Sequence, residues 1–445
     1  MIAHLFFIAA IVSALSLFVY SVLGIFKNIK LLKTPYPLYN VEDRLKKLFE
    51  VAFGQTRIMR FPLIGFLHAL VFWGFIVITI GSAEMIFDGI LGFTFDDNPA
   101  NDRVLKFLGI FYDILIGLGD VFALLIFSFV LVFLIRRKFM KVKRFEGNEM
   151  RHKDHKDAAI ALSFILFLMI TLLGMNIFYV TAFTAGGYEI SGIYPVSGTI
   201  AALFSGISTE SAHFLEMINW WAHIILIMAF ANYLPYSKHF HVFMSLPNVY
   251  LSKTTALTHL PNMQSVKKEV EAMMNPNAPA NETDSEPERF GVKDVEDATW
   301  KNYLDSLTCT QCGRCTSVCP ANLTGKKLSP RKIVLDYRRR MEEKQKGFRK
   351  QGKTYDDGKS LYGSYTTKEE LWACTTCNAC AQECPVCIDH PSLILEMRRY
   401  IYLEESAAPS SINAMCTNIE NNGAPWQYSS ADRLNWAKDL SMEVN

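Results

Sequence analysis

Five apolar stretches in the first half of the chain are each long enough to cross a lipid bilayer. A transmembrane helix needs about 20 consecutive, mainly apolar residues. The stretches lie at about residues 2–26, 61–82, 106–135, 158–182 and 214–235. The first is too long for the apolar core of a signal peptide and has no charged segment before it, so we interpret it as a span. The pattern therefore predicts five transmembrane helices within residues 1–245.

The loops between these stretches alternate in charge. The loops at 27–60 and 136–157 are rich in Lys and Arg, whereas the loop at 183–212 has neither. The loop predicted at 83–105 carries the acidic residues Glu84, Asp88, Asp96, Asp97 and Asp102. Because basic loops stay on the cytoplasmic side, we expect the amino terminus outside a bacterial inner membrane. Everything after the fifth span is then expected in the cytoplasm.

Two copies of one cysteine pattern lie in the second half of the chain, at Cys309–Pro320 and Cys374–Pro385. Each copy reads C-x-x-C-x-x-C-x-x-x-C-P, the spacing of bacterial ferredoxins, in which the fourth cysteine ligates the other of two [4Fe–4S] clusters. We therefore assign one cluster to Cys309, Cys312, Cys315 and Cys384. The other cluster is assigned to Cys374, Cys377, Cys380 and Cys319.

The alternatives for these cysteines are two zinc ribbons or a disulfide framework. Zinc ribbons use paired C-x-x-C motifs rather than four-cysteine runs that end in Cys-Pro, so the iron–sulfur interpretation is favoured. Clustered thiolates indicate a reducing compartment, which agrees with the cytoplasmic side given by the loop charges. Cys387 and Cys416 are left over and are expected to be dispensable for the clusters.

The residues around the motifs divide the rest of the chain. A polar stretch rich in Pro, Asn, Glu and Ser predicts a linker at 246–298, with one short amphipathic helix near Val266–Met274. Residues 299–445 are then an α-helical ferredoxin-type domain. Between its motifs, the basic segment Arg331–Tyr365 is expected to begin as a helix and end as a loop. We expect it to form a solvated surface, with a specific docking site as the alternative. Trp426, Arg433 and Trp436 are expected to pack against the domain or a neighbour.

Composition adds limits on partners. The chain has 445 residues, of which 50% are hydrophobic, and its formal net charge is +2. A charge so close to zero gives no global basic field for nucleic acid. The fold class expected is an all-α bundle of five transmembrane helices joined to a cytoplasmic α-helical domain with two [4Fe–4S] clusters.

Histidines within the membrane stretches are the second group of candidate ligands, because polar groups in a bilayer are costly and tend to be functional. His68 and His241 are expected near the same cytoplasmic depth and could hold one haem iron between them. His223 lies 18 residues before His241, which is five turns of a continuous helix, so both would share a face about 27 Å apart. This spacing suits two ligands that serve two haems stacked across the membrane, and the number of haems, one or two, is left open.

A resemblance supports the haem interpretation. His223, Pro235-Tyr-Ser-Lys and His241 resemble the last helix of the respiratory nitrate reductase gamma subunit, a five-helix dihaem b quinol oxidase. That family carries two histidines ten residues apart in its second helix, where this chain has His68 and Ile78. The resemblance implies haem b on His68 and His241. An outer haem on His223 would need another partner, for which the candidates are His4 and His213, and His239 competes for the inner haem.

The cysteine domain resembles the C subunit of heterodisulfide reductase, through residues 308–320, Lys327–Arg331 and Ile388–Pro391. The fusion is similar to membrane subunits that link electron-transfer flavoprotein, or a heterodisulfide-reductase-like partner, to menaquinone. Such systems also use cysteine-rich CCG modules. Because this chain has no such repeat, the resemblance implies a separate subunit, either a B- or D-like CCG module or a flavoprotein.

These observations predict a membrane-bound electron-transfer subunit of a quinone-linked oxidoreductase, with the direction of electron flow left open. Quinone chemistry needs proton delivery, for which Asp113 and Asp120, and Glu216 at similar depth, are candidates in the outer half of the membrane. The alternative is a redox-sensing or assembly protein whose membrane part is only an anchor. A haem absorbance spectrum would discriminate between the two.

Overall fold

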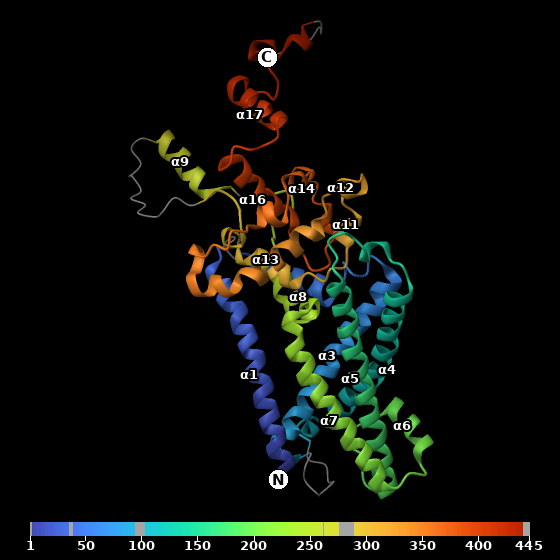
Figure 1. The fold of residues 1–445 in the computed structure, drawn as a ribbon. Coiled ribbons are helices and arrows are strands. Elements are labelled where there is room, and N and C mark those ends of the chain that lie inside the picture. Colours follow the sequence, from blue (N-terminus) through green and yellow to red (C-terminus); the bar gives the residue numbers. More distant parts are fainter. Residues whose placement is uncertain (1, 35–38, 94–102, 261, 276–288, 439–445) are drawn as a thin grey trace.

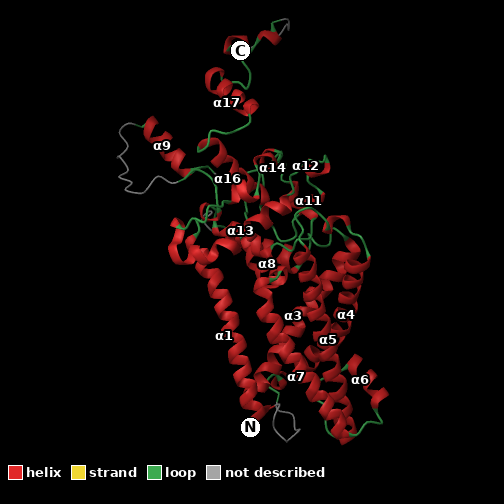
Figure 2. Cartoon of the chain, viewed as in Figure 1, coloured by secondary structure: helices red, strands yellow, loops and turns green. Residues whose placement is uncertain are grey.

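In a computed structural model of the chain, every regular element among the described residues is a helix (Figure 2). The structure describes residues 2–34, 39–93, 103–260, 262–275 and 289–438. A long bundle forms one part of the molecule, and a cap of shorter helices covers one end of it (Figure 1).

The bundle contains five helices of membrane-crossing length and composition, as expected. They are α1 (Ile2–Leu31), α3 (Pro62–Leu91), α4 (Ile110–Phe139), α5 (His152–Gly186) and α7 (Thr209–Tyr233). The third span, α4, begins at Ile110 rather than near residue 106. Residues 106–108 form a separate 3-10 turn, and Gly109 is the N-cap of α4. The short helix α6 (Pro195–Ala201) lies at the end of the bundle away from the cap (Figure 1).

Two acidic residues assigned to the 83–105 loop lie instead in α3. Glu84 and Asp88 are buried, and their carboxylates accept hydrogen bonds from the backbone N–H groups of Leu105 and Val104, at 3.1 and 2.9 Å. The two carboxylates thus provide hydrogen-bond acceptors for backbone N–H groups that have no acceptor within a helix. Asp96, Asp97 and Asp102 lie outside the described residues.

The last span is not one continuous helix, which corrects the expected register of His223 and His241. Helix α7 ends at Tyr233, two 3-10 turns follow, and α8 (His241–Tyr250) begins a new helix. Pro235 cannot donate a hydrogen bond to the preceding turn, and the extended Ser237 accepts one from the N–H of His239. The 18 residues therefore do not place both histidines on one helical face.

The cap consists of short helices around one long one, α13 (Pro330–Gln351). Its remaining helices are α10 (Trp300–Thr308), α11 (Arg314–Ser317), α12 (Pro320–Leu323), α14 (Lys368–Trp372), α15 (Ala379–Glu383) and α16 (His390–Leu403). The first part of the basic segment is a helix, as expected, but it is not a solvated surface. Helix α13 is the centre of the cap and buries Arg331, Arg340 and Lys344.

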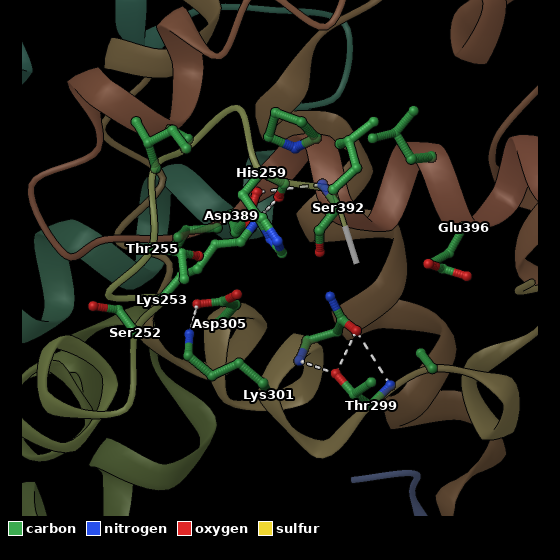
Figure 3. Close-up of a pocket in the computed structure, with 18 of the residues that line it drawn as sticks. Ser252, Lys253, Thr255, His259, Thr299, Lys301, Asp305, Asp389, Ser392 and Glu396 are labelled. Carbon is green, nitrogen blue, oxygen red and sulfur yellow. Dashed lines mark hydrogen bonds and ion pairs between the residues drawn. The ribbon is translucent and has the colours of Figure 1, made fainter. Parts of the chain in front are cut away.

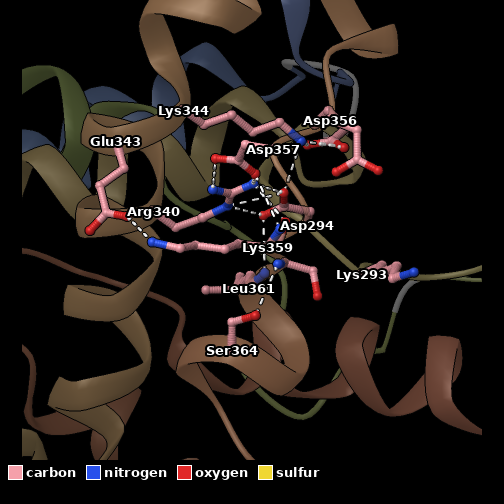
Figure 4. Close-up of polar contacts among 12 residues, drawn as sticks. Lys293, Asp294, Arg340, Glu343, Lys344, Asp356, Asp357, Lys359, Leu361 and Ser364 are labelled. Carbon is pink, nitrogen blue, oxygen red and sulfur yellow. Dashed lines mark hydrogen bonds and ion pairs between the residues drawn. The ribbon is translucent and has the colours of Figure 1, made fainter.

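Carboxylates, of which Asp294 is buried, pair with Arg340 and Lys344. The Arg340 guanidinium donates to both Asp294 and Asp357, and the Lys344 ammonium donates to Asp294 (Figure 4). Lys344 also donates to Glu296. Buried charges are tolerated when they are paired and hydrogen-bonded. This network holds the end of the predicted linker and the loop after α13 against one helix.

The bundle and the cap share one hydrophobic core. Phe230 and Phe240, from the end of the last span, belong to the same buried cluster as Ile333, Tyr337 and Ile394 of the cap. The two ends of the predicted linker are also packed, because Asn248 and Val292 are buried. The proposed division at 1–245, 246–298 and 299–445 therefore separates parts that are in firm contact.

Two helices project away from this body (Figure 1). Helix α9 (Gln264–Met274) confirms the short helix predicted near Val266–Met274. Helix α17 (Ser410–Asn422) leads to the last described residues, where Trp426 and Trp436 are 60% and 72% exposed. The tryptophans therefore do not pack into the core of the cap.

Candidate metal and cofactor centres

The first cysteine loop follows α10 and ends in α11. Cys309 caps the end of α10, and the backbone is left-handed at Gln311 (φ 56°) and Gly313 (φ 73°) before Cys315 enters α11. Glycine is required at 313, because a Cβ atom there would collide with the carbonyl oxygen of Arg144. The loop thus approaches the 136–157 loop of the bundle directly.

The second cysteine loop repeats the shape of the first. After Cys374, the backbone is left-handed at Thr376 (φ 53°) and Asn378 (φ 62°), at the same two offsets as in the first loop. Asn378 starts α15, which carries Cys380, and α15 packs against α11. Asparagine is among the residues that tolerate this conformation best after glycine.

The motif cysteines form two groups, according to which thiol charges interact. In the first group, the charge of Cys315 interacts most with Cys312, Cys309 and Cys384, and least with Cys380 of the second group. In the second group, Cys380 interacts with Cys374, Cys377 and Cys319. Each group therefore takes three cysteines from one motif and the last cysteine of the other. The crossed assignment requires this arrangement, and ligation itself stays a prediction.

Burial and crowding raise the pKa of the motif thiols Cys309 and Cys380. Burial, reinforced by neighbouring thiols, raises the pKa of Cys380 to about 12. Burial and the neighbouring Cys312 raise the pKa of Cys309 to about 11, against a hydrogen bond from Gln311 that lowers it. Thiolates crowded in this way need positive charge between them, which cluster iron supplies. Among the described residues, no three His, Cys, Asp or Glu side chains converge closely enough to hold one metal ion.

Backbone N–H groups point at two of the sulfurs. The N–H of Ile388 donates to Sγ of Cys384, and that of Thr376 donates to Sγ of Cys374, both at 3.4 Å. Hydrogen bonds to ligand sulfurs are one means by which proteins set the potential of iron–sulfur clusters. Cys377 is the exposed member of the second group, whereas Cys309, Cys315 and Cys384 of the first group are buried.

The first group lies against the bundle. The Arg57 guanidinium, before α3, donates to the carbonyl of Cys384 at 2.9 Å. In return, Arg314 of the first motif donates to the carbonyl of Arg57 at 2.8 Å and stacks over Phe61, which starts α3. The Lys238 ammonium, before α8, donates to Oε1 of Gln311 at 3.0 Å. The first group is therefore the inner one, facing the membrane helices.

Two of the candidate haem ligands lie within electrostatic range of each other. His68 is near enough to both His241 and Arg314 for their charges to interact. Nδ1 of His241 bonds to the carbonyl of Lys238 at 3.0 Å, which fixes its ring. Metal-ligating histidines usually hold the other ring nitrogen in this way. The ring of His239 lies 5.7 Å from that of His241, so His239 is also at this position.

His223 is buried in α7, away from these residues in the chain, and has one ring nitrogen without a partner. Its Nδ1 bonds to Thr171 Oγ1 and the carbonyl of Leu168, at 2.9 and 3.0 Å, while Nε2 is buried and unbonded in the described structure. Ile78 and Ile224 belong to one apolar cluster, so no side chain on α3 supplies a second ligand at residue 78.

The other candidate partners of His223 have different contacts. Nε2 of His4 bonds to the carbonyl of Ile90 at 2.8 Å. His213 is 62% exposed and bonds to Glu216 at 2.9 Å. Among the described contacts, none joins His223 to either histidine.

Asp120 has a structural role. Its carboxylate accepts hydrogen bonds from the N–H groups of Val196 and Ser197, at 2.8 and 2.9 Å, and so caps the start of α6. Asn176 also donates to it at 3.3 Å. Asp113 is half-buried in the first turn of α4.

The sequence analysis did not identify the residues that join the bundle to the cap. Arg57, Lys238 and Arg314 were interpreted only as loop or motif positions, because single cations near a helix end carry no specific signal. The direct approach at Gly313 could have been suspected, since glycine inside a cysteine motif often marks a close backbone approach.

Comparisons with known proteins agree with the cysteine geometry. The family description of the 4Fe-4S dicluster domain matches residues 301–385. These residues are a 4Fe-4S dicluster domain. The match runs from α10 through both cysteine loops to the proline after Cys384.

Two relatives match most of the chain, including the bundle. The chain is 29% identical to the protein named Probable iron-sulfur-binding oxidoreductase FadF of Bacillus subtilis, over 97% of this chain and 60% of the relative. It is 26% identical to the EtfAB:quinone oxidoreductase of Syntrophomonas wolfei, over 89% of this chain and 54% of the relative. The chain thus spans little more than half the length of these two proteins.

A shorter match covers part of the chain. Over 22% of this chain and 46% of the relative, the chain is 32% identical to the C subunit of the ferredoxin:CoB-CoM heterodisulfide reductase of Methanosarcina mazei. The resemblances to heterodisulfide reductase and to flavoprotein-linked quinone oxidoreductases are therefore confirmed. No solved structure matches the chain. With its five membrane-length helices, the chain is an iron–sulfur, oxidoreductase-like membrane protein for electron transfer.

Proposed function

We propose that this chain is the membrane subunit of a quinone-linked oxidoreductase and that its carriers lie in a row. The outer cysteine group faces a soluble partner, the inner group faces the bundle, and His68 with His241 would hold haem b. Two [4Fe–4S] clusters and a haem supply one-electron transfer when bound. The chain's own residues hold and orient these groups.

The position of Arg314 is the observation that carries this proposal. Its guanidinium donates to the carbonyl of Arg57 at 2.8 Å and lies over the ring of Phe61, at the start of the helix that carries His68. Arg314 therefore ties the first cysteine motif to that helix, and it is within electrostatic range of Cys312, Cys384 and His68. An anchor that served only to tether the cysteine domain would not need a pair of histidines within electrostatic range of each other.

The proposal favours one haem. His68 and His241 interact, whereas Ile78 fills an apolar cluster and His223 has no second histidine among its described contacts. His223 would instead present Nε2 to a quinone as a hydrogen-bond partner, with its ring held by the carbonyl of Leu168. Asp120, held as a helix cap, is then a poor proton relay.

The partner and orientation follow from exposure and charge. Cys377 is the exposed thiol of the outer group, and a separate flavoprotein or CCG-module subunit would dock beside it. Both basic loops lie at the end of the bundle that carries the cap (Figure 1), so we infer a cytoplasmic cap and an external amino terminus in a bacterial inner membrane. The name of the S. wolfei relative supports the quinone link.

Haem content in histidine variants tests the proposal. His68→Ala and His241→Ala should each abolish the low-spin haem spectrum of the purified protein, because an iron with two axial imidazoles loses one of them. His223→Ala is the control, since it removes another histidine of the bundle and should leave the spectrum unchanged. If the haem survives His241→Ala but is lost in His239→Ala, then His239 rather than His241 is the axial ligand. Protein without any haem would favour the anchor interpretation.

A further inference from the structure

A cavity of about 520 Å³ lies between the cap and the loops that connect the membrane helices. Its walls come from the segment before α3, the segment after α8, α10 and the start of α16 (Figure 3). Its volume is in the range of sites for small molecules and cofactors. None of the proposed haem ligands lines it, and Cys387 is a lining residue that the cluster assignment leaves unused.

The charged residues that line the cavity are unequal in number. Among the described lining residues, eight are Lys or Arg and four are Asp or Glu. Each of the four carboxylates already has a cation beside it. The ion pairs are Asp297 with Arg289, Asp305 with Lys301, Asp389 with Lys253, and Glu396 with Arg399. Figure 3 shows Lys301 beside Asp305, and Lys253 beside Asp389.

Two of the remaining cations are held by carbonyl oxygens rather than by carboxylates of the described residues. The Lys47 ammonium donates to the carbonyl of Lys253 at 2.7 Å. Arg57 donates through Nη1 to the carbonyls of Ala381 and Cys384, at 3.3 and 2.9 Å. Carbonyls satisfy hydrogen bonds but do not neutralise charge, so both side chains keep a positive charge and spare donors.

The charges at Lys47 and Arg57 repel each other. Burial lowers the pKa of Lys47, and the neighbouring Arg57, Lys301 and Arg44 lower it further, against an opposing effect of Cys387. A partly buried cation without a counter-charge is costly. An anion in the cavity would relieve this repulsion and use the free donors of both side chains.

We propose that this cavity binds a phosphate-bearing anion through Lys47 and Arg57. Arg57 bonds to the carbonyl of Cys384, so the anion would lie next to the inner cysteine loop. Its source is either the headgroup of an anionic phospholipid, since the cavity lies at the level of the helix ends, or a soluble phosphate ester. This site does not depend on the proposed haem or quinone.

Direct binding to the purified full-length protein tests the site. Isothermal titration calorimetry with inorganic pyrophosphate should show one site, weakened about ten-fold or more by Lys47→Gln, because one charged hydrogen bond is replaced by a neutral one. Arg57→Gln should act similarly. Arg60→Gln is the control, since Arg60 lies on the same segment and bonds to the same loop at Gln382 and Glu383 but does not line the cavity. Iron content equal to wild type would show that each variant is folded.

Native mass spectrometry separates the two sources. If wild-type protein retains a phosphatidylglycerol that pyrophosphate displaces and Lys47→Gln does not retain, the ligand is a lipid headgroup. If no lipid is retained but pyrophosphate binds and depends on Lys47, the ligand is a soluble phosphate ester. Absence of both lipid and pyrophosphate binding would overturn the proposal. So would binding that is equal in wild type, Lys47→Gln and Arg57→Gln.

Discussion

Replacing Arg331 should loosen the cap from the bundle. Arg331 is 1% exposed and pairs with the buried Glu149 at 2.7 Å. Its guanidinium also donates to the carbonyls of Arg144 and Glu146, at 2.8 and 2.7 Å, so one side chain from α13 holds the 136–157 loop of the bundle. Arg331→Met would leave the Glu149 carboxylate buried without its cation.

The cost of such a change is about 3–5 kcal/mol for a buried ion pair broken on one side. A domain of 150–250 residues melts about 2–4 °C lower for each kcal/mol, so cluster absorbance should bleach about 6–20 °C lower than in wild type. The double variant Arg331→Met with Glu149→Met should recover at least half of this loss, because no unpaired charge remains. Lys327→Met removes an exposed pair with Glu369 and should not move the melting temperature measurably.

Two results would refute this reasoning. A melting temperature for Arg331→Met equal to wild type would show that the pair does not hold the cap. A double variant as unstable as the single one would show that the loss comes from packing, not from the unpaired carboxylate.

The pair should also depend on pH. Burial raises the pKa of Glu149, but Arg331 and the hydrogen bonds to this carboxylate together lower it by more, so the net shift is downward. The stabilisation by this pair should therefore be present above about pH 4.5 and be lost as the pH falls further.

Further predictions concern the clusters and the α13 network. Cys319→Ser should disturb the outer cluster nucleated by Cys374, and electron paramagnetic resonance that instead shows loss of the inner cluster would refute the crossed assignment. The hydrogen bond from Arg340 lowers the pKa of Asp357 to about 2, against a smaller effect of burial. Its contribution to stability should therefore vanish as the pH falls from about 4 to about 2. Arg340→Met should raise the acid midpoint of cluster bleaching, and an unchanged midpoint would contradict this.

The membrane spans and the cysteine motifs were predictable because each depends only on residues that are close together in the sequence. Length and hydropathy alone locate membrane helices, and the helix from Gln264 to Met274 shows its amphipathic period directly. The cysteine spacing indicated the type of domain for the same reason, since three ligands of one cluster lie between Cys309 and Cys315.

Features that depend on tertiary packing were not predictable in this way. The basic face of α13 was expected in solvent, yet Arg340 is buried because Asp294 and Asp357, from segments far apart in the sequence, neutralise it. The break between His223 and His241 was also missed. Proline predicts a kink, but only the capping by Ser237 and the new helix at His241 turn the kink into a separate element.

The most direct test of the account is the order of the carriers. Wild-type protein and the Cys315→Ser variant, each in detergent, would be mixed with a menaquinol analogue and frozen at set times. Optical and electron paramagnetic resonance spectra would then follow the haem and each cluster. The account predicts that Cys315→Ser leaves haem reduction intact and stops reduction of the outer cluster, because the inner cluster lies between them. An outer cluster reduced at the wild-type rate in Cys315→Ser would contradict it.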